Sequence, residues 1–576
     1  MDGRRRILAT FFLLALAFAL VAGRLVQLQV FRGSELSARA ERQQQRVVKL
    51  NPKRGTIFDR MGRELAVSVD VDSVYGVPAA TGNPKALARQ LGRILQKDPR
   101  ALEQQLAGNA RFVWLSRKID PARAEKVKSL DSKTVGLLVE SKRFYPKKAL
   151  GGSLLGFTGI DNEGLEGVEL AFDGALRGQS GWVLAEKDAV GRTAFAGGTA
   201  LQYKLPQPGK DVVLTVDEVI QHIAEKELDV MLVETRAKSA VCIVMDPKTG
   251  AVLALAVRST GGVKPAFNPN ARQRYKPAEW RNRAITDVAE PGSTFKAILA
   301  AAALEEKIVT PNERFDCSAG KIAVAGRTIR DAKTHGILTF SDVIADSSNV
   351  GTIKVAMRLG KERLYEYIAA FGFGRKTGID LSGEIGGLVK HHRLWQPSSI
   401  GSIAIGQEIG VTPIQMAAAY GAIANGGLLM KPYVVSEIVD PQGHDGRRFG
   451  PETVRRVISE RTAEATRTIL RAVVESGTGG RARPSGFTAA GKTGTAQKID
   501  PGTGAYSLDE YVSSFIGFAP AEEPKLVIVV MVDSPKGAVL GGTVAAPVFK
   551  AVAEQSLAYL QVPPDDVGGR TLMVAK

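Results

Sequence analysis

The amino-acid sequence predicts an α+β protein with a membrane anchor at its amino terminus and two folded domains after it. Three observations predict this organisation. A predominantly apolar run covers residues 7–23, strand-like segments lie at both ends of the region after residue 211, and mostly helical patterns fill the space between them. With 576 residues, 44% of them hydrophobic and 24% charged, the chain can form two or three domains with cores of their own. We divide the chain into residues 1–24, a short tail and anchor; residues 25–210, a non-catalytic domain; and residues 211–576, a second domain with a short carboxy-terminal tail.

The anchor follows from charge and hydropathy together. Three arginines at residues 4–6 precede the apolar run, and Arg24 closes it. Because basic residues mark the cytoplasmic flank of a span, we expect a single membrane pass with the N-terminus in the cytoplasm and the rest of the chain outside. A signal peptide cleaved at residues 17–19 remains an alternative, but the apolar run continues past that site, which favours a retained anchor.

The formal net charge of +18 and the pI near 9.7 indicate an anionic neighbour. An anionic membrane surface fits better than nucleic acid, because the sequence contains no zinc-finger spacing, RNA-binding signature or basic helix. The five histidines are scattered without metal-ligand spacing, so we expect no metal and no other cofactor. Cys242 and Cys317 give no disulfide framework; two buried thiols or one pair both remain open.

The first domain shows elements but no catalytic constellation. Residues 54–68 combine turn residues, two short apolar strands and paired charges, which predicts a hairpin with a surface salt bridge. Residues 83–130 have helical periodicity, and residues 143–146 and 159–167 are loop-like. We therefore interpret this part as a spacer or docking domain.

The second domain begins after a Pro- and Gly-containing boundary near residues 206–211. A short strand at 212–217 leads into a helix, and a hairpin is expected from 240–245 and 251–257. Further elements expected here are strands at 512–518 and 526–532, helices over much of 293–475, and a closing helix at 543–560. The result is a sheet whose strands come from both ends of the domain, with a mostly helical insertion.

The sequence around Ser293 carries the strongest chemical signal. Pro291 and Gly292 break the preceding segment, and the alanine- and leucine-rich run that starts at Phe295 predicts a helix. Ser293 then lies in the first turn, where free backbone N–H groups favour a developing anion. Lys296 is three residues further on and projects from the same face. A desolvated lysine of this kind can activate a serine nucleophile.

The pattern S-x-x-K occurs twice, so it needs support. The second copy is Ser318 to Lys321, followed by residues 322–326, which read as a strand or turn and do not hold the lysine over the serine. An ordinary helix-start serine is the simple alternative for Ser293. Two later segments favour the nucleophile.

Ser347, Ser348 and Asn349 form the first of these segments, a short polar turn between two helical patterns, where side chains can point inward. Solvated loop residues are the simple alternative. Lys492, Thr493, Gly494 and Thr495 form the second. Small residues beside a lysine allow another backbone to approach, and two hydroxyls beside an ammonium suit a carboxylate.

The second segment also has a competing interpretation, as the phosphate-binding loop of a nucleotide-binding protein. Residues 486–493 fit G-x-x-x-x-G-K-[ST] letter for letter, and the strand at 526–532 ends at Asp533. Such a loop needs a buried strand before it and a helix after it. Residues 475–485 are instead rich in Gly, Arg and Pro, and Gly494 and Pro501 follow. A nucleotide-binding protein remains a remote alternative.

The three motifs, in this order, resemble those of the penicillin-binding proteins and serine β-lactamases. Residues 54–68, 143–146 and 164–166 are similar to the non-catalytic domain of the class B penicillin-binding proteins. The resemblance thus covers nearly the whole chain. It implies an elongated α+β pedestal domain and a transpeptidase domain with an antiparallel sheet flanked by helices. Residues 66–68, 406–409 and 491–498 look like those of division-type members, the septal transpeptidases of the penicillin-binding protein 3 group.

The resemblance implies a D,D-transpeptidase that cross-links peptidoglycan stem peptides. Ser293 would attack the carbonyl between the two terminal D-alanines, with Lys296 as its base. Ser347 and Lys492 would relay the proton to the leaving amine, and Asn349 would hydrogen-bond the substrate's peptide amide.

The resemblance assigns substrate binding to the strand that carries Lys492. Thr493 and Thr495, on either side of Gly494, would bind the terminal carboxylate. The backbone N–H groups of Ser293 and Thr495 would form the oxyanion hole, which typically contributes a few kcal/mol per donor.

The same resemblance implies partners and alternatives. β-Lactams would acylate the serine, the lipid-linked precursor would supply stem peptides, and a separate membrane glycosyltransferase would act with other division proteins. The implied location is the cell inner membrane, with the catalytic domain periplasmic. An elongation-type transpeptidase and a hydrolase of the same fold, either a D,D-carboxypeptidase or a β-lactamase, remain alternatives. A β-lactam sensor is more remote, because such sensors need several spans and a cytoplasmic effector domain.

Overall fold

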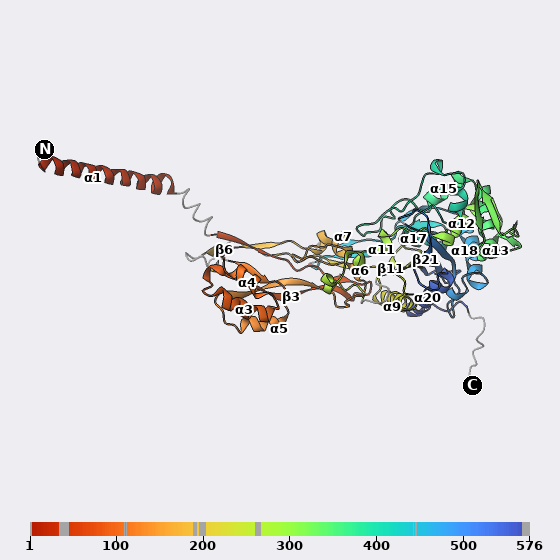
Figure 1. Cartoon of the computed structure of the whole chain (residues 1–576), viewed down its shortest axis with the longest axis horizontal. Coiled ribbons are helices and arrows are strands. Elements are labelled where there is room, and N and C mark those ends of the chain that lie inside the picture. The colour runs from red at the N-terminus through yellow and green to blue at the C-terminus, as the bar shows by residue number, and fades with distance from the viewer. Residues whose placement is uncertain are drawn as a thin grey trace, which may run out of the picture. The chain divides into compact units, whose positions relative to one another are not determined.

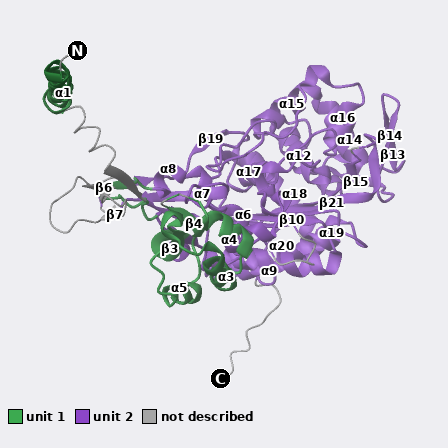
Figure 2. Cartoon of the chain, turned by 60° about the vertical axis from the view of Figure 1, so that its left-hand side comes forward, with its two compact units in different colours: residues 1–53, 70–142, 178–209 green, residues 54–69, 143–177, 210–576 purple. Residues whose placement is uncertain are grey.

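The computed structural model describes residues 3–33, 45–108, 110, 112–187, 193–194, 203–259, 266–441, 443, 446–500 and 502–566. Two compact units make up the chain, and each is interleaved in sequence (Figure 2). Unit 1 comprises residues 1–53, 70–142 and 178–209, and unit 2 comprises residues 54–69, 143–177 and 210–576. The expected short carboxy-terminal tail lies largely outside the described residues.

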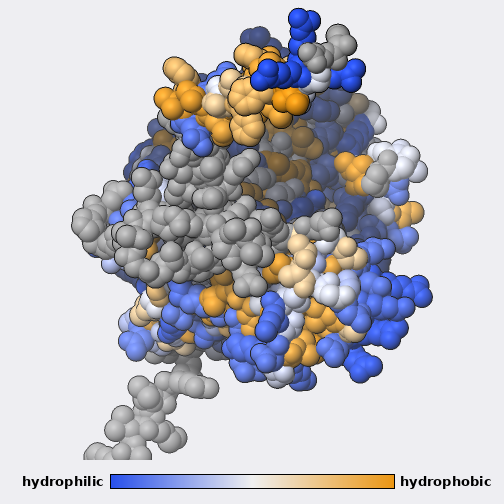
Figure 3. Space-filling view, turned by 90° about the vertical axis from the view of Figure 1, so that its left-hand side faces the viewer, coloured by the Kyte–Doolittle hydropathy of each residue, from blue (hydrophilic) through white to orange (hydrophobic). Residues whose placement is uncertain are grey.

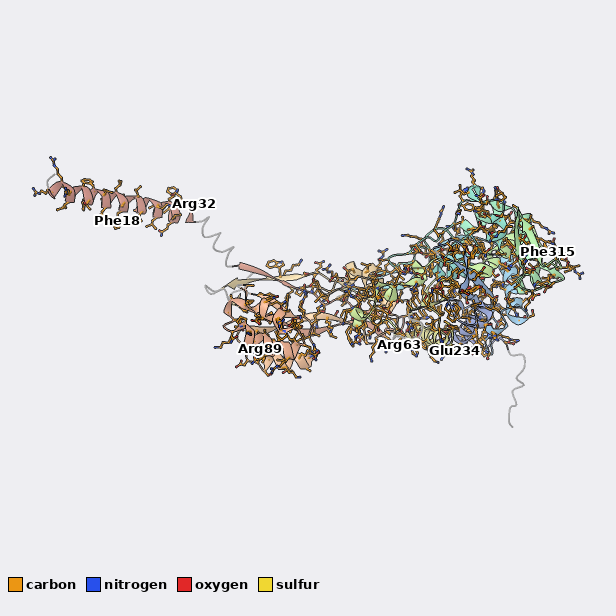
Figure 4. The ribbon with its side chains drawn as sticks, in the orientation of Figure 1. Phe18, Arg32, Arg63, Arg89, Glu234 and Phe315 are labelled. Carbon is orange, nitrogen blue, oxygen red and sulfur yellow. The ribbon has the colours of Figure 1, made fainter. Side chains whose placement is uncertain are left out.

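The N-terminal apolar run forms one long helix. α1 (Gly3–Val26) continues into a π-helical turn, η1 (Gln27–Phe31), and together they are long and apolar enough to cross a membrane, with a mean hydropathy of 2.2. None of its side chains is buried, and Phe18 is 75% exposed (Figure 4). Figure 3 shows the helix as a largely hydrophobic surface with hydrophilic residues at one end. A helix that is apolar all round and unpacked fits lipid as its surroundings.

Unit 1 contains a small sheet with helices on one face. β4 (Val113–Ser116) pairs antiparallel with the second half of β3 (Glu64–Gly76), and β5 (Val135–Phe144) also pairs with β3. Three helices supply the core with leucines that meet Val74 and Leu115 of the sheet: α3 (Pro84–Leu95), α4 (Pro99–Leu106) and α5 (Pro121–Lys128).

The helix starts of unit 1 follow from local sequence. Each of these three helices has proline as its first residue, preceded by a capping side chain: Asn83, Asp98 or Asp120. The helical periodicity expected over 83–130 is borne out by α3, α4 and α5 and is wrong at β4. Residues 113–115, Val-Trp-Leu, favour a strand and place Leu115 in the core.

A second sheet in unit 1 is built from residues distant in sequence. β1 (Gln45–Leu50) pairs antiparallel with β6 (Gly181–Lys187), and the short strands β7 (Thr193–Ala194) and β8 (Tyr203–Lys204) also pair with β6. A 3₁₀ turn, η2 (Pro78–Ala80), follows β3.

Unit 2 is organised around a five-stranded antiparallel sheet. Its order is β11 (Val252–Arg258), β10 (Ser239–Met245), β22 (Leu526–Asp533), β21 (Tyr506–Ala519) and β20 (Ala490–Ile499). The expected hairpin and the two expected C-terminal strands are therefore confirmed, and the strands do come from both ends of the domain. β21 begins six residues earlier than expected, because its first part continues the hairpin with β20.

The two faces of this sheet bury different partners. Along β10, Val241, Ile243 and Met245 join the core that contains α17 (Pro413–Ala424), whereas Cys242 and Val244 join the core that contains α9 (Glu218–Thr235) and α20 (Ala546–Tyr559). Alternation of this kind is what a sheet covered on both faces requires. Figure 1 shows α9 and α20 beside the sheet, yellow and blue, from segments more than 300 residues apart in the sequence.

The insertion between the strands is mostly helical, as expected. Its α-helices are α10 (Pro277–Trp280), α11 (Arg283–Thr286), α12 (Lys296–Glu305), α13 (Phe340–Ala345), α14 (Asn349–Leu359), α15 (Lys361–Ala370), α16 (Ser399–Ala404), α17 and α18 (Glu460–Glu475). Its 3₁₀ turns are η3 (Pro269–Arg274), η4 (Gly292–Phe295), η5 (His392–Leu394) and η6 (Gly480–Ala482). After the insertion and the last two strands, α19 (Gly541–Val544) precedes α20. Its strand pairs are β12 (Arg314–Asp316) with β15 (Ile337–Thr339), β13 (Lys321–Val324) with β14 (Arg327–Arg330), and β16 (Leu428–Met430) with β19 (Thr453–Arg456).

A second sheet of unit 2 joins β18 (Arg447–Arg448), β17 (Val435–Val439), β9 (Asp211–Leu214) and β2 (Ile57–Phe58), and β2 forms the expected hairpin with β3. The short helices α6 (Gly152–Leu155), α7 (Gly167–Ala171) and α8 (Asp173–Leu176) belong to the same unit.

Arg54, at the start of the expected hairpin, is buried. Arg54 and Arg143 each place their Nε atom 2.5 Å from the Glu169 carboxylate, and Arg54 also bonds Asp173. The side chains of both arginines are 1% exposed. Within the hairpin, Arg63 Nη1 lies 3.6 Å from Asp59 Oδ2, so the expected salt bridge is present, with the arginine side chain 40% exposed and the carboxylate buried. Arg54 pairs instead with Glu169, far from it in sequence.

Candidate active site

Ser293 stands out as the accessible residue of a buried segment. η4 carries it and continues directly into α12. Every other residue from Pro291 to Ala303 is buried, whereas Ser293 is half-buried. The Gly292 N–H donates to Gly406 O over 3.0 Å, which holds the turn at its start. The expected helix start is confirmed, and it presents one hydroxyl to the surface.

Lys296 is fully buried and aimed at the second motif. Its Nζ lies 2.7 Å from Ser347 O, 2.7 Å from Asn349 Oδ1 and 3.2 Å from Ser347 Oγ. A neutral amine has two N–H bonds, which the two closest acceptors occupy, and its lone pair is then left for a hydroxyl proton. Burial, and next the charge of Lys492, hold the pKa of Lys296 well below its ordinary value.

The Ser347 turn has an unusual backbone. Ser347 lies between α13 and α14 with a φ of +62°, in the left-handed region that non-glycine residues seldom adopt. Asn349 is the first residue of α14, and its Nδ2 donates to Arg330 O over 2.8 Å. The left-handed turn brings both the carbonyl and the hydroxyl of Ser347 to Lys296.

Lys492 lies on β20 and is also fully buried. Burial lowers its pKa to about 7, with Asp346 acting in the opposite direction. Within the described part of the chain, its Nζ makes two long contacts, at 3.4 Å, to the carbonyl and the hydroxyl of Thr493. An amine with so few partners can change its protonation state near neutral pH.

The rest of the motif on β20 packs against the nucleophile turn. A Cβ on Gly494 would lie 2.9 Å from Thr294 Cγ2 and 3.0 Å from Pro291 O, so only glycine permits this approach. The Gly541 N–H donates to Thr495 Oγ1 over 3.0 Å. The Thr495 hydroxyl therefore accepts within the protein and keeps its own hydrogen for another acceptor.

β20 is the last strand of the sheet. It pairs with β21 on one side, and no strand of the described residues pairs with its other side. An open strand edge offers backbone N–H and C=O groups to an extended peptide.

Two contributors to the site have no signal in the sequence near the motifs. Asp331, just after β14, accepts hydrogen bonds from Asn349 N–H, from Val350 N–H over 3.0 Å and from Ser348 Oγ over 2.9 Å. The hydroxyl of Thr478, which is exposed, lies 2.9 Å from that of Thr493. Each is more than ten residues from its partner, so only the fold brings them together.

The second S-x-x-K copy is not assembled into a site. Ser318 is exposed in a turn and its hydroxyl donates to Asp316, and Lys321 is exposed at the start of β13. The structure therefore agrees with the expectation that nothing holds Lys321 over Ser318.

The phosphate-loop alternative is wrong. Gly491, Lys492 and Thr493 lie inside β20, and β20 runs on to Ile499 and turns into β21 rather than into a helix. Lys492 is fully buried in this strand rather than in a loop before a helix start. No group of three or more His, Cys, Asp and Glu residues among the described residues could hold a metal ion, and Cys242 and Cys317 are buried free thiols.

Comparisons with known proteins match this architecture. The model of the penicillin-binding protein transpeptidase domain matches residues 240–554, and that of the penicillin-binding protein dimerisation domain matches residues 49–214. Stage V sporulation protein D of Bacillus subtilis is 37% identical over 569 residues, covering 97% of this chain and 86% of its own. The peptidoglycan D,D-transpeptidase FtsI of Escherichia coli is 33% identical over 564 residues, covering 96% and 91%.

Solved structures agree with these relatives. Penicillin-binding protein 3 of Mycobacterium tuberculosis in complex with aztreonam superposes with a TM-score of 0.69 at 29% identity, covering 90% of this chain and 98% of its own. A peptidoglycan synthetase of Bifidobacterium adolescentis superposes with a TM-score of 0.72 at 26% identity, covering 92% and 98%.

Proposed function

The chain belongs to the class B penicillin-binding proteins and is a serine-type peptidoglycan D,D-transpeptidase, and we propose that it works through an acyl-enzyme on Ser293. The observation that carries this proposal is the buried amine of Lys296. It is held by Ser347 O and Asn349 Oδ1, one helical turn from the accessible hydroxyl of Ser293.

In the acylation step the Ser293 oxygen attacks the carbonyl carbon between the two terminal D-alanines, and Lys296 takes the hydroxyl proton. The tetrahedral oxyanion forms beside the backbone N–H groups of Ser293 and Thr495. The C–N bond then breaks, and the last D-alanine leaves as an amine with a proton relayed through Ser347 and Lys492. The product is an ester on Ser293.

In the second step the amine of a neighbouring stem peptide attacks the ester carbonyl. The new amide forms, the C–O bond to Ser293 breaks, and the serine recovers its proton through the same lysine. The amide bond to the last D-alanine is thus replaced by the new amide bond of the cross-link, so the reaction needs no external energy source.

Substrate binding fits the open edge of β20. An extended stem peptide pairs with this edge by main-chain hydrogen bonds, while Asn349 bonds the substrate's amide. The hydroxyls of Thr493 and Thr495, beside the amine of Lys492, receive the terminal carboxylate. Gly494 keeps the strand close enough to Ser293 for the carbonyl to be attacked.

The decisive experiment is covalent labelling with a fluorescent penicillin. The full chain extracted in detergent should gain the mass of one adduct, and peptide mapping should find it on Ser293. Ser293→Ala should abolish labelling while leaving the melting temperature nearly unchanged, since a helix-start serine contributes about 1 kcal/mol at most. Ser318→Ala, the matched control, should label normally. An adduct on Ser318, or none on folded protein, would refute the assignment.

We infer a division role from the FtsI-like relatives. A fluorescent fusion should gather at midcell, and depletion should give filaments; rounded cells with uniform labelling would point to the elongation type. Its partners would then be a membrane glycosyltransferase, the lipid-linked precursor and other division proteins. Release of D-alanine without cross-linked product would identify a D,D-carboxypeptidase instead.

The membrane-anchored chain would sit in the inner membrane with its catalytic domain in the periplasm, which the arginines at residues 4–6 support. Sequencing the N-terminus of membrane-extracted protein checks retention of the anchor. A start at Leu20 would show cleavage after residues 17–19.

A further inference from the structure

The side chain of Asp331, which lies outside α14, caps the N-terminus of that helix. One carboxylate oxygen accepts from the Asn349 N–H and the Val350 N–H, and the other accepts from the Ser348 hydroxyl. Its own backbone N–H donates to Gly320 O over 2.9 Å, which fixes the residue that supplies the carboxylate. These contacts bind the end of β14 to the turn that carries the second motif.

The same contacts determine how Asn349 faces Lys296. The Asn349 side chain donates through Nδ2 to Arg330 O, the residue before Asp331, and accepts through Oδ1 from Lys296 Nζ. With its amide group fixed on one side by β14, the oxygen is the atom that faces the lysine. The position of one of the two close acceptors of Lys296 therefore depends on residues 330 and 331.

Charge adds a second link between Asp331 and Lys296. The charged groups that act on Lys296 are Lys492, on β20, and Asp331, after β14; Asp346, at the end of α13, acts on Lys492. Burial and Lys492 favour the neutral amine of Lys296, whereas Asp331 favours its ammonium. Asp331 is thus the anion that opposes Lys492 at the proposed base.

We propose that Asp331 is a positioning residue for acylation: its carboxylate holds the start of α14 so that Asn349 faces Lys296. This inference rests on the proposed role of Lys296 as the base. Asp331 touches no reacting atom. A residue that only capped α14 would affect stability but not the pH dependence of acylation.

The test measures the second-order rate constant of acylation by fluorescent penicillin between pH 5 and 10, on the detergent-extracted full chain. The acid limb of this profile reports ionisation of the free enzyme's base. Asp331→Asn removes the negative charge and leaves one side-chain oxygen that can accept hydrogen bonds, whereas the carboxylate has two. Without the anion the pKa of Lys296 falls, so the limb should move to lower pH by about half a unit or more. The plateau rate should fall about tenfold, because Asn349 is less firmly held.

Two further variants separate charge from geometry. Asp331→Glu keeps the charge but shifts its position, so its limb should stay at the parent pH while its plateau falls. Ser348→Ala removes one hydrogen bond to Asp331 and keeps the charge, so it should lose thermal stability with an unmoved limb. If Asp331→Asn does not fold, the plateau rate of Asp331→Glu still tests the positioning role, because an unchanged plateau in that variant would overturn it.

A matched control comes from another loop of the same unit. Asp380 also accepts two backbone N–H groups, from Val434 over 2.7 Å and Val435 over 2.9 Å. Asp380→Asn should lower stability and leave the acid limb in place. The proposal is overturned if Asp331→Asn labels with an unmoved limb, if Asp331→Glu moves it, or if Asp380→Asn moves it equally. Absence of labelling on Ser293 in the parent would instead refute the proposed function itself.

Discussion

The phenolic O–H of Tyr420 donates to the carbonyl oxygen of Thr294 over 2.7 Å, and both side chains are fully buried. Tyr420 lies on α17, which packs against the central sheet, and Thr294 is the residue after the proposed nucleophile. Together with the hydrogen bond from Gly292 to Gly406, this contact holds the turn on both sides of Ser293. The geometry of the nucleophile is therefore set by residues more than 100 positions away in sequence.

Removing the Tyr420 hydroxyl tests this link. Tyr420→Phe leaves the Thr294 carbonyl buried without its donor, so we expect a loss of about 1–2 kcal/mol in stability and slower acylation. Thermal unfolding and the acylation rate measure the two effects. Tyr275→Phe is the matched control, since Tyr275 also donates to a backbone carbonyl, that of Ala266. Equal acylation rates in the Tyr420→Phe variant and the parent would contradict the link.

The amine of Lys492 should impose a descending limb on the acylation profile. Its pKa is about 7, so above neutral pH it loses the charge that, in the proposed mechanism, attracts the substrate's carboxylate. Lys296 and Lys492 interact, so the two limbs belong to the pair. Lys492→Arg keeps a cation at every pH and should lose the descending limb while acylating more slowly. A descending limb unchanged in Lys492→Arg would assign it to another group.

Burial of Lys492 should also cost stability in a defined pH window. The unfolded chain binds a proton near the ordinary lysine pKa of 10.5, but the folded chain does so only near 7. Stability therefore falls as the pH drops from about 10.5 to about 7, and this term is constant below that. Lys492→Met should raise the melting temperature, by little at pH 10 and by most at pH 7. Lys361→Met, at an exposed lysine, should show no such trend.

Glycine at position 494 should be required for activity. A Cβ there would lie 2.4 Å from Ser514 Oγ and 3.0 Å from Pro291 O, and the latter is backbone of the nucleophile turn. Gly494→Ala should slow acylation about 100-fold by displacing β20 from Ser293. Gly336→Ala adds its Cβ in open space and is the control. If both variants acylate like the parent, the close packing of β20 on this turn is not needed.

Structural features that depend on residues close together in sequence could be predicted from the sequence. The helix start at Ser293, the hairpin of β10 and β11, and the helical insertion all follow from turn residues and periodicity within about 20 positions. The three motifs could be ordered along the chain, and the structure brings Lys296 to Ser347 and Asn349. Their roles in catalysis stay predictions.

What escaped prediction depends on contacts between distant residues. Asp331 and Tyr420 are common residue types in ordinary surroundings, and only the fold places them at Asn349 and Thr294. The burial of Arg54 was missed because its partner Glu169 lies 115 positions away. The strand β4 was missed because helical patterns surround it on both sides.

The open edge of β20 has a consequence for selectivity. A strand edge binds the peptide backbone through main-chain hydrogen bonds, and this binding depends little on the identity of the side chains. In the proposed binding mode the enzyme would tolerate variation along the peptide and would discriminate mainly at the reacting end, through Thr493, Thr495 and Lys492. The same edge could bind a reversible inhibitor. An extended peptide mimic with a terminal carboxylate would compete with the substrate for the edge of β20 without carrying any group that acylates Ser293.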